Sequence, residues 1–332
     1  MRANQQPLAP KTGGRVGPRG LLVPLLMGLC LILLATTIPV FRPYEGTPYS
    51  LLGWLAYAWD NSPDARHGAI VPLIVAWLVW RRRHDLAALP REGAWLGVVA
   101  VAFGAGMFWL GWKGDIHYVN YMAYLMIIGG LILAYFGWRW FYELLFPWAF
   151  LMFAMPMPFL DEVLGFRLRL FMASASTGIL NLIGVEATRR GTAIYSTMDA
   201  SLGFPEGRIF SLDVADPCSG LNSLFALVML TALYAHLTQN RAWKQWFLFM
   251  CALPLAVLGN MFRVTSIAIV AAGIDQKFAS GPYHTLAGYL VFVVAIGSMI
   301  LVGKLLDTDW RGKFARLGRR IDHTAHRPSD TY

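Results

Sequence analysis

Charged side chains are scarce in this sequence. Asp, Glu, Lys and Arg together make up 14% of its 332 residues, which is roughly half the share found in soluble globular domains. Hydrophobic residues account for 57% of the chain, and its mean hydropathy is +0.50. The composition therefore excludes a soluble globular protein and predicts an integral membrane protein.

Cysteine is also rare. The chain has three cysteines, too few and too scattered for a disulfide framework. Lys and Arg outnumber Asp and Glu, which gives a formal net charge of +9. These basic residues stand in short segments beside apolar runs, where they are expected to orient helices rather than bind phosphates. We expect no nucleic-acid partner, and the sequence indicates neither a cofactor nor a metal.

Long apolar runs fill most of the chain. A helix needs about 20 apolar residues to cross the hydrocarbon core of a membrane, and several segments come near that length. We therefore expect an all-α polytopic membrane protein with about eight transmembrane helices. The second and fifth segments are short and could be tilted neighbours of interfacial helices. The expected spans are residues 21–41, 67–82, 94–112, 118–136, 140–156, 220–237, 246–272 and 284–303.

The positions of Lys and Arg predict the orientation, because basic residues in short loops are retained on the cytoplasmic side. The basic segments are 1–20, 81–83, 139, 241–244 and 304–332. One topology satisfies all of them: both termini are cytoplasmic, and a membrane domain covers 21–303. We expect the two terminal tails, 1–20 and 304–332, to be disordered or to lie on anionic membrane lipids.

The same topology places a long segment, about 157–219, on the extracytoplasmic side. Its first part, 161–183, has the pattern of an amphipathic helix that lies in the membrane interface. Thr192–Met198 and Arg208–Val214 then alternate polar and apolar residues around a turn rich in glycine, which predicts a β-hairpin. This small insertion leads directly to Cys218.

Topology also separates the cysteines. Cys30 and Cys251 fall within apolar spans, where a cysteine behaves as a small hydrophobe. Cys218 stands at an aqueous boundary and begins a helix, where unpaired N–H groups and the helix dipole favour the reactive thiolate. Asp213 and Asp216 oppose that negative charge unless a cation offsets them. The alternative is a thiol that merely caps the helix.

Arg263 could be that cation. It lies in the apolar run 246–272 near its extracytoplasmic end, and ionisable residues within a span point to function by default. Asn260, one turn earlier, shares its helix face and could orient the guanidinium. The alternative is a snorkelling arginine that anchors the end of the helix.

The histidines are sorted in the same way. Of the seven in the chain, His67, His117 and His284 fall on the extracytoplasmic side. His284 begins the last span, where an imidazole can take a thiol proton near neutral pH. His67 is its rival, because it too begins a span. Either ring could instead be an ordinary interfacial residue that only forms hydrogen bonds.

These residues match the pattern of acyl transfer by a cysteine and a histidine. The Cys218 thiolate would attack a carbonyl, and the imidazole would return the proton to the leaving amine. Arg263 would stabilise the oxyanion, helped by the backbone N–H groups of Ser219 or Gly220. One alternative is a transporter or channel whose pathway is lined by Arg263 and Asn260. Another is a thiol redox protein, but the chain offers no second cysteine on that side to resolve a disulfide.

Four motifs in this order resemble the exosortase/archaeosortase family of membrane cysteine transpeptidases. The motifs are His67–Leu73 running on to Arg81–Arg83, Cys218–Leu221, Asn260-x-x-Arg263 and His284. Together they cover roughly residues 66–300. The resemblance implies that Cys218, Arg263 and His284 are the catalytic residues.

The resemblance also implies a substrate and a location. The substrates would be secreted proteins that carry a short C-terminal recognition motif, a transmembrane helix and a basic cytoplasmic end. The enzyme would cleave this sorting signal on the extracytoplasmic side of a prokaryotic cytoplasmic membrane, through a thioester acyl-enzyme. Water or another nucleophile would then accept the acyl group, which leaves peptidase and transpeptidase both open.

Overall fold

The computed structural model describes residues 18–43, 46–156, 165–197, 209–213 and 221–308. The chain is mostly helical. Its internal contacts divide it into two compact units, which we call unit 1 (Met1–Met157) and unit 2 (Pro158–Tyr332).

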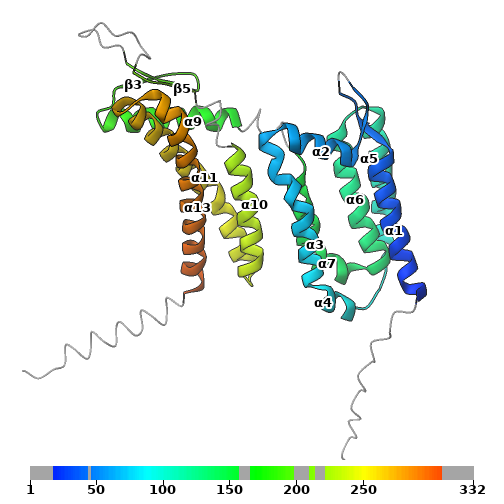
Figure 1. Ribbon diagram of the computed structural model, residues 1–332. Coiled ribbons are helices and arrows are strands. Elements are labelled where there is room, and N and C mark those ends of the chain that lie inside the picture. The colour runs from blue at the N-terminus through cyan, green and yellow to red at the C-terminus, as the bar shows by residue number, and fades with distance from the viewer. Residues whose placement is uncertain (1–17, 44–45, 157–164, 198–208, 214–220, 309–332) are drawn as a thin grey trace, which may run out of the picture. The chain divides into compact units, whose positions relative to one another are not determined.

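Unit 1 consists of helices and one small sheet (Figure 1). The sheet is an antiparallel pair of strands, β1 (Pro39–Phe41) and β2 (Tyr49–Ser50), which joins the first two helices. The helices and helical turns are α1 (Pro18–Thr37), α2 (Leu51–Asn61), η1 (Pro63–Ile70), α3 (Val71–Arg81), α4 (Arg83–Ala88), α5 (Trp95–Lys113), α6 (His117–Phe136), α7 (Trp138–Phe150) and η2 (Leu151–Ala154).

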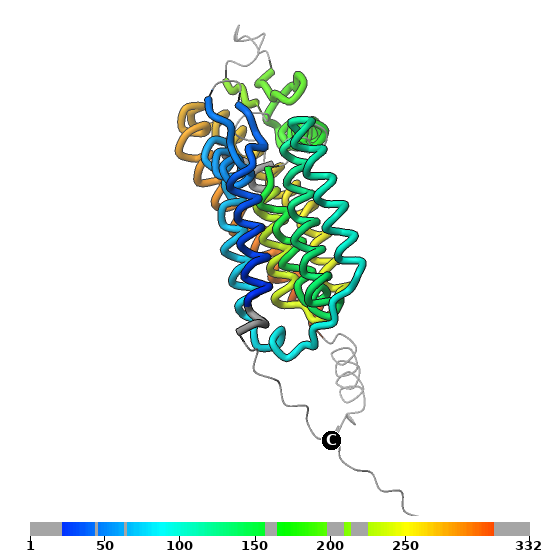
Figure 2. Tube along the Cα trace, turned by 90° about the vertical axis from the view of Figure 1, so that its right-hand side faces the viewer, coloured from blue at the N-terminus to red at the C-terminus, as the bar shows by residue number. Residues whose placement is uncertain are grey.

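Helices α5 and α6 run side by side as an antiparallel pair (Figures 1 and 2). Glycines on α5 permit the close approach, because a Cβ at Gly97 would collide with the backbone of Ala134. A Cβ at Gly104 would lie 2.9 Å from the Ile127 side chain, and one at Gly111 would lie 3.0 Å from Oδ1 of Asn120. Small residues at helix contacts are typical of membrane proteins, where van der Waals packing drives association.

Within the described residues, four helices are long and apolar enough to cross a membrane: α5, α6, α11 (Ala242–Gly273) and the segment Gln276–Asp307, which contains α13 (His284–Asp307). Two shorter apolar helical segments, Leu22–Thr37 and Phe225–Thr238, lie in the first and sixth expected spans. The second and fifth expected spans contain α3, of 11 residues, and α7, of 13 residues. Helices of that length fall well short of the hydrocarbon thickness. Each of the eight expected ranges thus contains a helix, but the count of eight spans is not confirmed.

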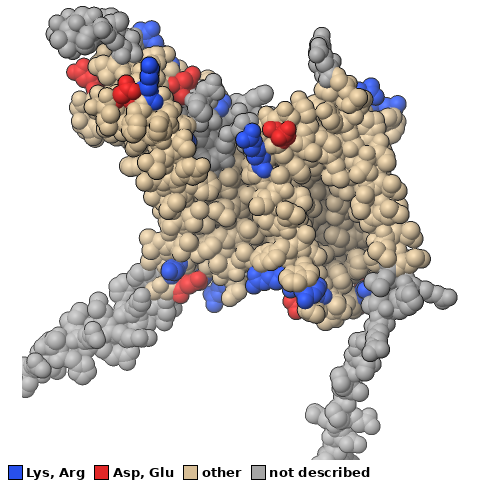
Figure 3. All heavy atoms as spheres, in the orientation of Figure 1, with Lys and Arg blue, Asp and Glu red and all other residues tan. Residues whose placement is uncertain are grey.

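Charged side chains are few within the long apolar helices, and Arg263 of α11 is the exception that concerns the candidate site. On the face shown in Figure 3, the middle of each unit is free of Lys, Arg, Asp and Glu. Unit 1 has an ion pair between Arg82 Nη1, just after the end of α3, and Glu143 Oε2 of α7 at 2.6 Å. Unit 2 has another, between Lys244 Nζ and Asp307 Oδ1 at 2.7 Å. This distribution is the one expected of helices that pass through an apolar layer.

Unit 2 combines a three-stranded sheet with a second group of helices (Figure 1). The sheet consists of β3 (Ala187–Arg190), β4 (Ala193–Ser196) and β5 (Ser211–Asp213), in the order β3-β4-β5 with both neighbours antiparallel. The helices and helical turns are α9 (Phe166–Leu182), α10 (Leu221–Thr238), α11 (Ala242–Gly273), α12 (Gln276–Phe278), η4 (Ala279–Tyr283) and α13 (His284–Asp307).

Strands β4 and β5 fall within the two segments that were expected to form a hairpin, and they pair with Ala193 opposite Asp213. The turn that was expected between them lies outside the described residues. Strand β3 was not predicted. It joins β4 through a tight turn in which Gly191 adopts a φ of +63°, a conformation that glycine allows without a steric penalty.

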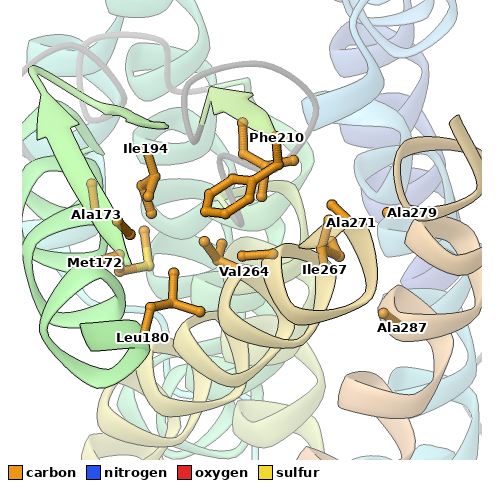
Figure 4. Packing of buried hydrophobic residues seen from close by; sticks show 13 residues of the cluster. Met172, Ala173, Leu180, Ile194, Phe210, Val264, Ile267, Ala271, Ala279 and Ala287 are labelled. Carbon is orange, nitrogen blue, oxygen red and sulfur yellow. The ribbon is translucent and has the colours of Figure 1, made fainter. Parts of the chain in front are cut away.

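The core of unit 2 lies between α9, the sheet and α11 (Figure 4). Met172, Ala173 and Leu180 of α9 face this core, and their spacing places them on one side of the helix. Phe166, Phe171 and Leu182 of the same helix are exposed. Helix α9 thus lies within the expected amphipathic helix 161–183 but has apolar side chains on both sides; residues 161–164 lie outside the described part.

Candidate active site

Arg263 of α11 contacts the first residue of α13. Its terminal nitrogen Nη2 lies 3.1 Å from Nε2 of His284 and 3.4 Å from the backbone carbonyl oxygen of His284. The two residues are 21 positions apart in the sequence, on helices that pack together in unit 2. The structure therefore brings two of the predicted catalytic side chains into direct contact.

This contact determines which nitrogen of the imidazole is the acceptor. A guanidinium carries hydrogen-bond donors and no acceptor, so Arg263 Nη2 donates and His284 Nε2 holds the lone pair. This direction requires the tautomer of His284 that carries its proton on Nδ1. In the structure, the lone pair of His284 Nε2 therefore accepts a hydrogen bond from Arg263.

The chain before His284 is tied to the strand that precedes Cys218. Gln276 at the start of α12 donates its side-chain N–H to the carbonyl oxygen of Ser211 in β5, at 3.1 Å. Asp275 caps α12 by accepting the N–H of Phe278 at 3.0 Å. The segment that leads to His284 thus contacts the strand that leads to Cys218.

Cys218, Ser219 and Gly220 lie outside the described residues. The chain enters their segment from β5 and leaves it into α10. Their predicted roles, as nucleophile and as oxyanion donors, stay predictions. The described part contains two free cysteines, of which Cys30 is exposed and Cys251 is half-buried.

Asn260 lies one turn before Arg263 on α11 and is 3% exposed. Its amide Nδ2 donates to the sulfur of Met172 on α9 at 3.1 Å. The sequence suggested that Asn260 supports the guanidinium, and nothing in the sequence indicated the contact with Met172. The asparagine therefore joins the helix that carries Arg263 to the amphipathic helix.

His67, the rival of His284, lies in η1 of unit 1, whereas His284 belongs to unit 2. The residue after it, Gly68, is closely packed: a Cβ there would lie 2.6 Å from Nε1 of Trp59 and 2.7 Å from the carbonyl oxygen of Ala154. Trp59 donates to that same oxygen at 2.8 Å. The glycine of the motif His67-Gly68 is thus explained by packing inside unit 1.

His117, the third candidate histidine, packs among aromatic rings at the start of α6. Its ring centroid lies 4.7 Å from that of Trp54, 4.2 Å from that of Tyr118 and 5.0 Å from that of Phe41. These distances are typical of packed aromatic pairs. His117 is therefore a packing residue of unit 1 in this structure.

The described residues contain no group of three or more His, Cys, Asp or Glu side chains that could hold a metal ion.

A family model matches more than two thirds of the chain. It is the model of the transmembrane exosortases, and it covers residues 59–301. The matched range runs from Trp59, which packs on Gly68, to a position near the end of α13 and includes Arg263 and His284. No curated protein and no solved structure matches the chain.

Proposed function

The chain belongs to the transmembrane exosortase family, and on that basis we propose that it cleaves the C-terminal sorting signals of secreted proteins. Membership of the family implies a multi-pass membrane protein that acts as a cysteine peptidase or transpeptidase. The proposal adds the residues that do the chemistry: Cys218 as nucleophile, His284 as base and then acid, and Arg263 as the oxyanion donor.

The observation that carries this proposal is the contact between Arg263 Nη2 and His284 Nε2 at 3.1 Å. An anion accepts a stronger hydrogen bond from a guanidinium than a neutral ring nitrogen does. As the attack begins and negative charge builds on the substrate carbonyl oxygen, Arg263 exchanges His284 for that oxygen. The exchange frees the lone pair of Nε2 in the same step in which Nε2 takes the thiol proton, so the base becomes available as the oxyanion donor is engaged.

The proposed reaction proceeds in balanced steps. The thiol proton of Cys218 passes to Nε2 of His284, and the sulfur attacks the substrate carbonyl carbon to form a tetrahedral oxyanion. Collapse of this intermediate breaks the carbon–nitrogen bond, and the imidazolium gives its proton to the leaving amine. A thioester on Cys218 remains until water or an amine attacks it, and the thiol is then restored.

The proposed substrate has three parts: a short recognition motif, a transmembrane helix and a basic cytoplasmic end. A membrane-embedded enzyme suits such a substrate, because both partners lie in the same bilayer with a fixed orientation. The distribution of basic residues supports placing the active site on the extracytoplasmic face of the prokaryotic cytoplasmic membrane, with both termini inside.

A processing assay with a cysteine control tests the proposal. Cells that carry a tagged secreted protein with a C-terminal sorting signal are expected to accumulate its shortened form. The double variant Cys30→Ala/Cys251→Ala should process this protein within about twofold of the wild-type rate, because both cysteines stand on apolar helices, where a cysteine behaves as a small hydrophobic side chain. The length of the tagged protein on immunoblots measures processing by the wild type and by the double variant. Absence of processing by the wild-type chain would contradict the proposed function.

A further inference from the structure

Gly288 of α13 lies directly against the guanidinium of Arg263. A Cβ built on Gly288 would be 3.1 Å from Nη2, 3.4 Å from Cζ and 3.7 Å from Nε of Arg263. The same nitrogen, Nη2, contacts Nε2 of His284 at 3.1 Å. Gly288 follows His284 by four positions, which is one helical turn, so both residues face α11 from the same side of α13.

A methyl group at Gly288 would move the guanidinium. The contact of 3.1 Å between the added Cβ and Nη2 is shorter than an ordinary van der Waals separation. Relief of this contact requires a shift of a few tenths of an ångström, and Arg263 would move away from α13. Because Nη2 is the atom that bonds His284, the shift would lengthen that hydrogen bond.

Other glycines in the same region have different surroundings. Gly297, also within α13, has no heavy atom within 4 Å of a built Cβ. Gly259 of α11 packs on α13 through Val291, whose Cγ1 would lie 2.8 Å from an added Cβ. Glycine is unfavourable in a helix interior, so each position has a conformational cost, but at Gly288 the absent side chain leaves room for Arg263.

We propose that Gly288 is a positioning residue for Arg263: it provides the space in which the guanidinium lies against α13 and reaches His284. This inference rests on the proposed function for its effect on the rate, since Arg263 acts there as the oxyanion donor. The contact between Gly288 and Arg263, and its effect on the His284 ring, do not depend on the reaction.

The first test measures the imidazole itself. In purified protein labelled with ¹⁵N-histidine, the ring signals of His284, assigned with a His284→Gln variant, are expected to show an acceptor at Nε2 and a proton on Nδ1. Gly288→Ala should shift these signals toward those of Arg263→Ala, in which the donor is absent. Gly297→Ala should leave them at their wild-type positions. Wild-type signals in Gly288→Ala would overturn the inference, even if the enzymatic function were also wrong.

The second test measures the rate. Gly288→Ala is expected to lower kcat about 10- to 100-fold with little change in KM, because a displaced oxyanion donor loses interactions made in the transition state. In an Arg263→Lys background the same substitution should have less than about a twofold effect, since a lysine places no planar group over residue 288. A role in helix packing alone predicts an equal loss in both backgrounds, and that result would contradict the inference.

Gly259→Ala is the matched packing control. It crowds the same pair of helices through Val291 but adds no atom against the guanidinium. It is expected to lower thermal stability while leaving the ¹⁵N signals of His284 unchanged. If Gly259→Ala and Gly288→Ala shifted the ring signals equally, the effect would belong to helix packing and the proposed role of Gly288 would be wrong.

Discussion

Cells in which Cys218 is replaced by alanine are expected to accumulate the full-length substrate, because Cys218 is the proposed nucleophile of the acyl-enzyme. Loss of a catalytic nucleophile reduces turnover by several orders of magnitude, so processing should fall at least about 10³-fold, below detection on an immunoblot. Cys218→Ser should also be inactive or nearly so, since an alcohol is a far weaker nucleophile than a thiolate at neutral pH.

Two controls make this result specific. The level of Cys218→Ala in the membrane should equal that of the wild type, because a single substitution outside the expected apolar spans leaves those spans intact. The Cys30→Ala/Cys251→Ala variant should remain active in the same cells. Processing by Cys218→Ala at the wild-type rate would remove Cys218 from the mechanism.

Replacement of Arg263 by alanine is expected to slow processing about 10²- to 10³-fold, the range observed when one oxyanion donor is removed. The loss should appear in kcat more than in KM, because the donor acts on charge that develops in the transition state. Arg263→Lys should retain part of the activity, since it keeps the charge but loses the planar group that contacts both His284 and Gly288. Rates measured with purified variants and a tagged substrate check this order.

Substitutions of Arg263 and Cys218 also distinguish the proposed enzyme from a transporter. If Arg263 and Asn260 lined a transport pathway, Arg263→Glu would change solute flux in vesicles, and Cys218→Ala would leave that flux unaltered. The contact of Arg263 with a second side chain of catalytic type favours the enzyme. A processing rate that changed less than about threefold in Arg263→Ala would contradict the proposed role as oxyanion donor.

The long apolar helices were well predicted. The run 246–272 corresponds to α11, Ala242–Gly273, and the run 284–303 to α13, which begins at His284 as expected. Such helices are visible in the sequence because the bilayer demands a continuous apolar stretch.

The shorter runs show what hydropathy does not determine. Residues 67–82 were expected as one span, but their first part belongs to the 3₁₀ turn η1, and α3 begins at Val71, beside Pro72. In 140–156, α7 ends at Phe150 and continues as the 3₁₀ turn η2. Apolar composition says that a segment avoids water, whereas the type and length of its helix depend on proline and on tertiary contacts.

The sequence named Arg263 and His284 as site residues but gave no geometry for them. Elimination by topology left His67, His117 and His284 as candidate histidines and placed Arg263 at the same membrane depth. The contact of Arg263 with His284 depends on how α11 rotates against α13, which side chains such as Val291 and glycines such as Gly288 decide. The sequence shows that Gly288 lies one helical turn after His284. Only the structure shows that the Arg263 side chain runs against this glycine.

The most direct test of the central claim is the mass of the enzyme after a short reaction with substrate. Purified protein, quenched in acid and digested, is expected to show a peptide containing Cys218 that carries the N-terminal part of the cleaved substrate through a thioester. Hydroxylamine should remove the added mass, and the adduct should be absent from Cys218→Ala. Efficient cleavage with no adduct on Cys218, or with the adduct on Cys30 or Cys251, would contradict the account.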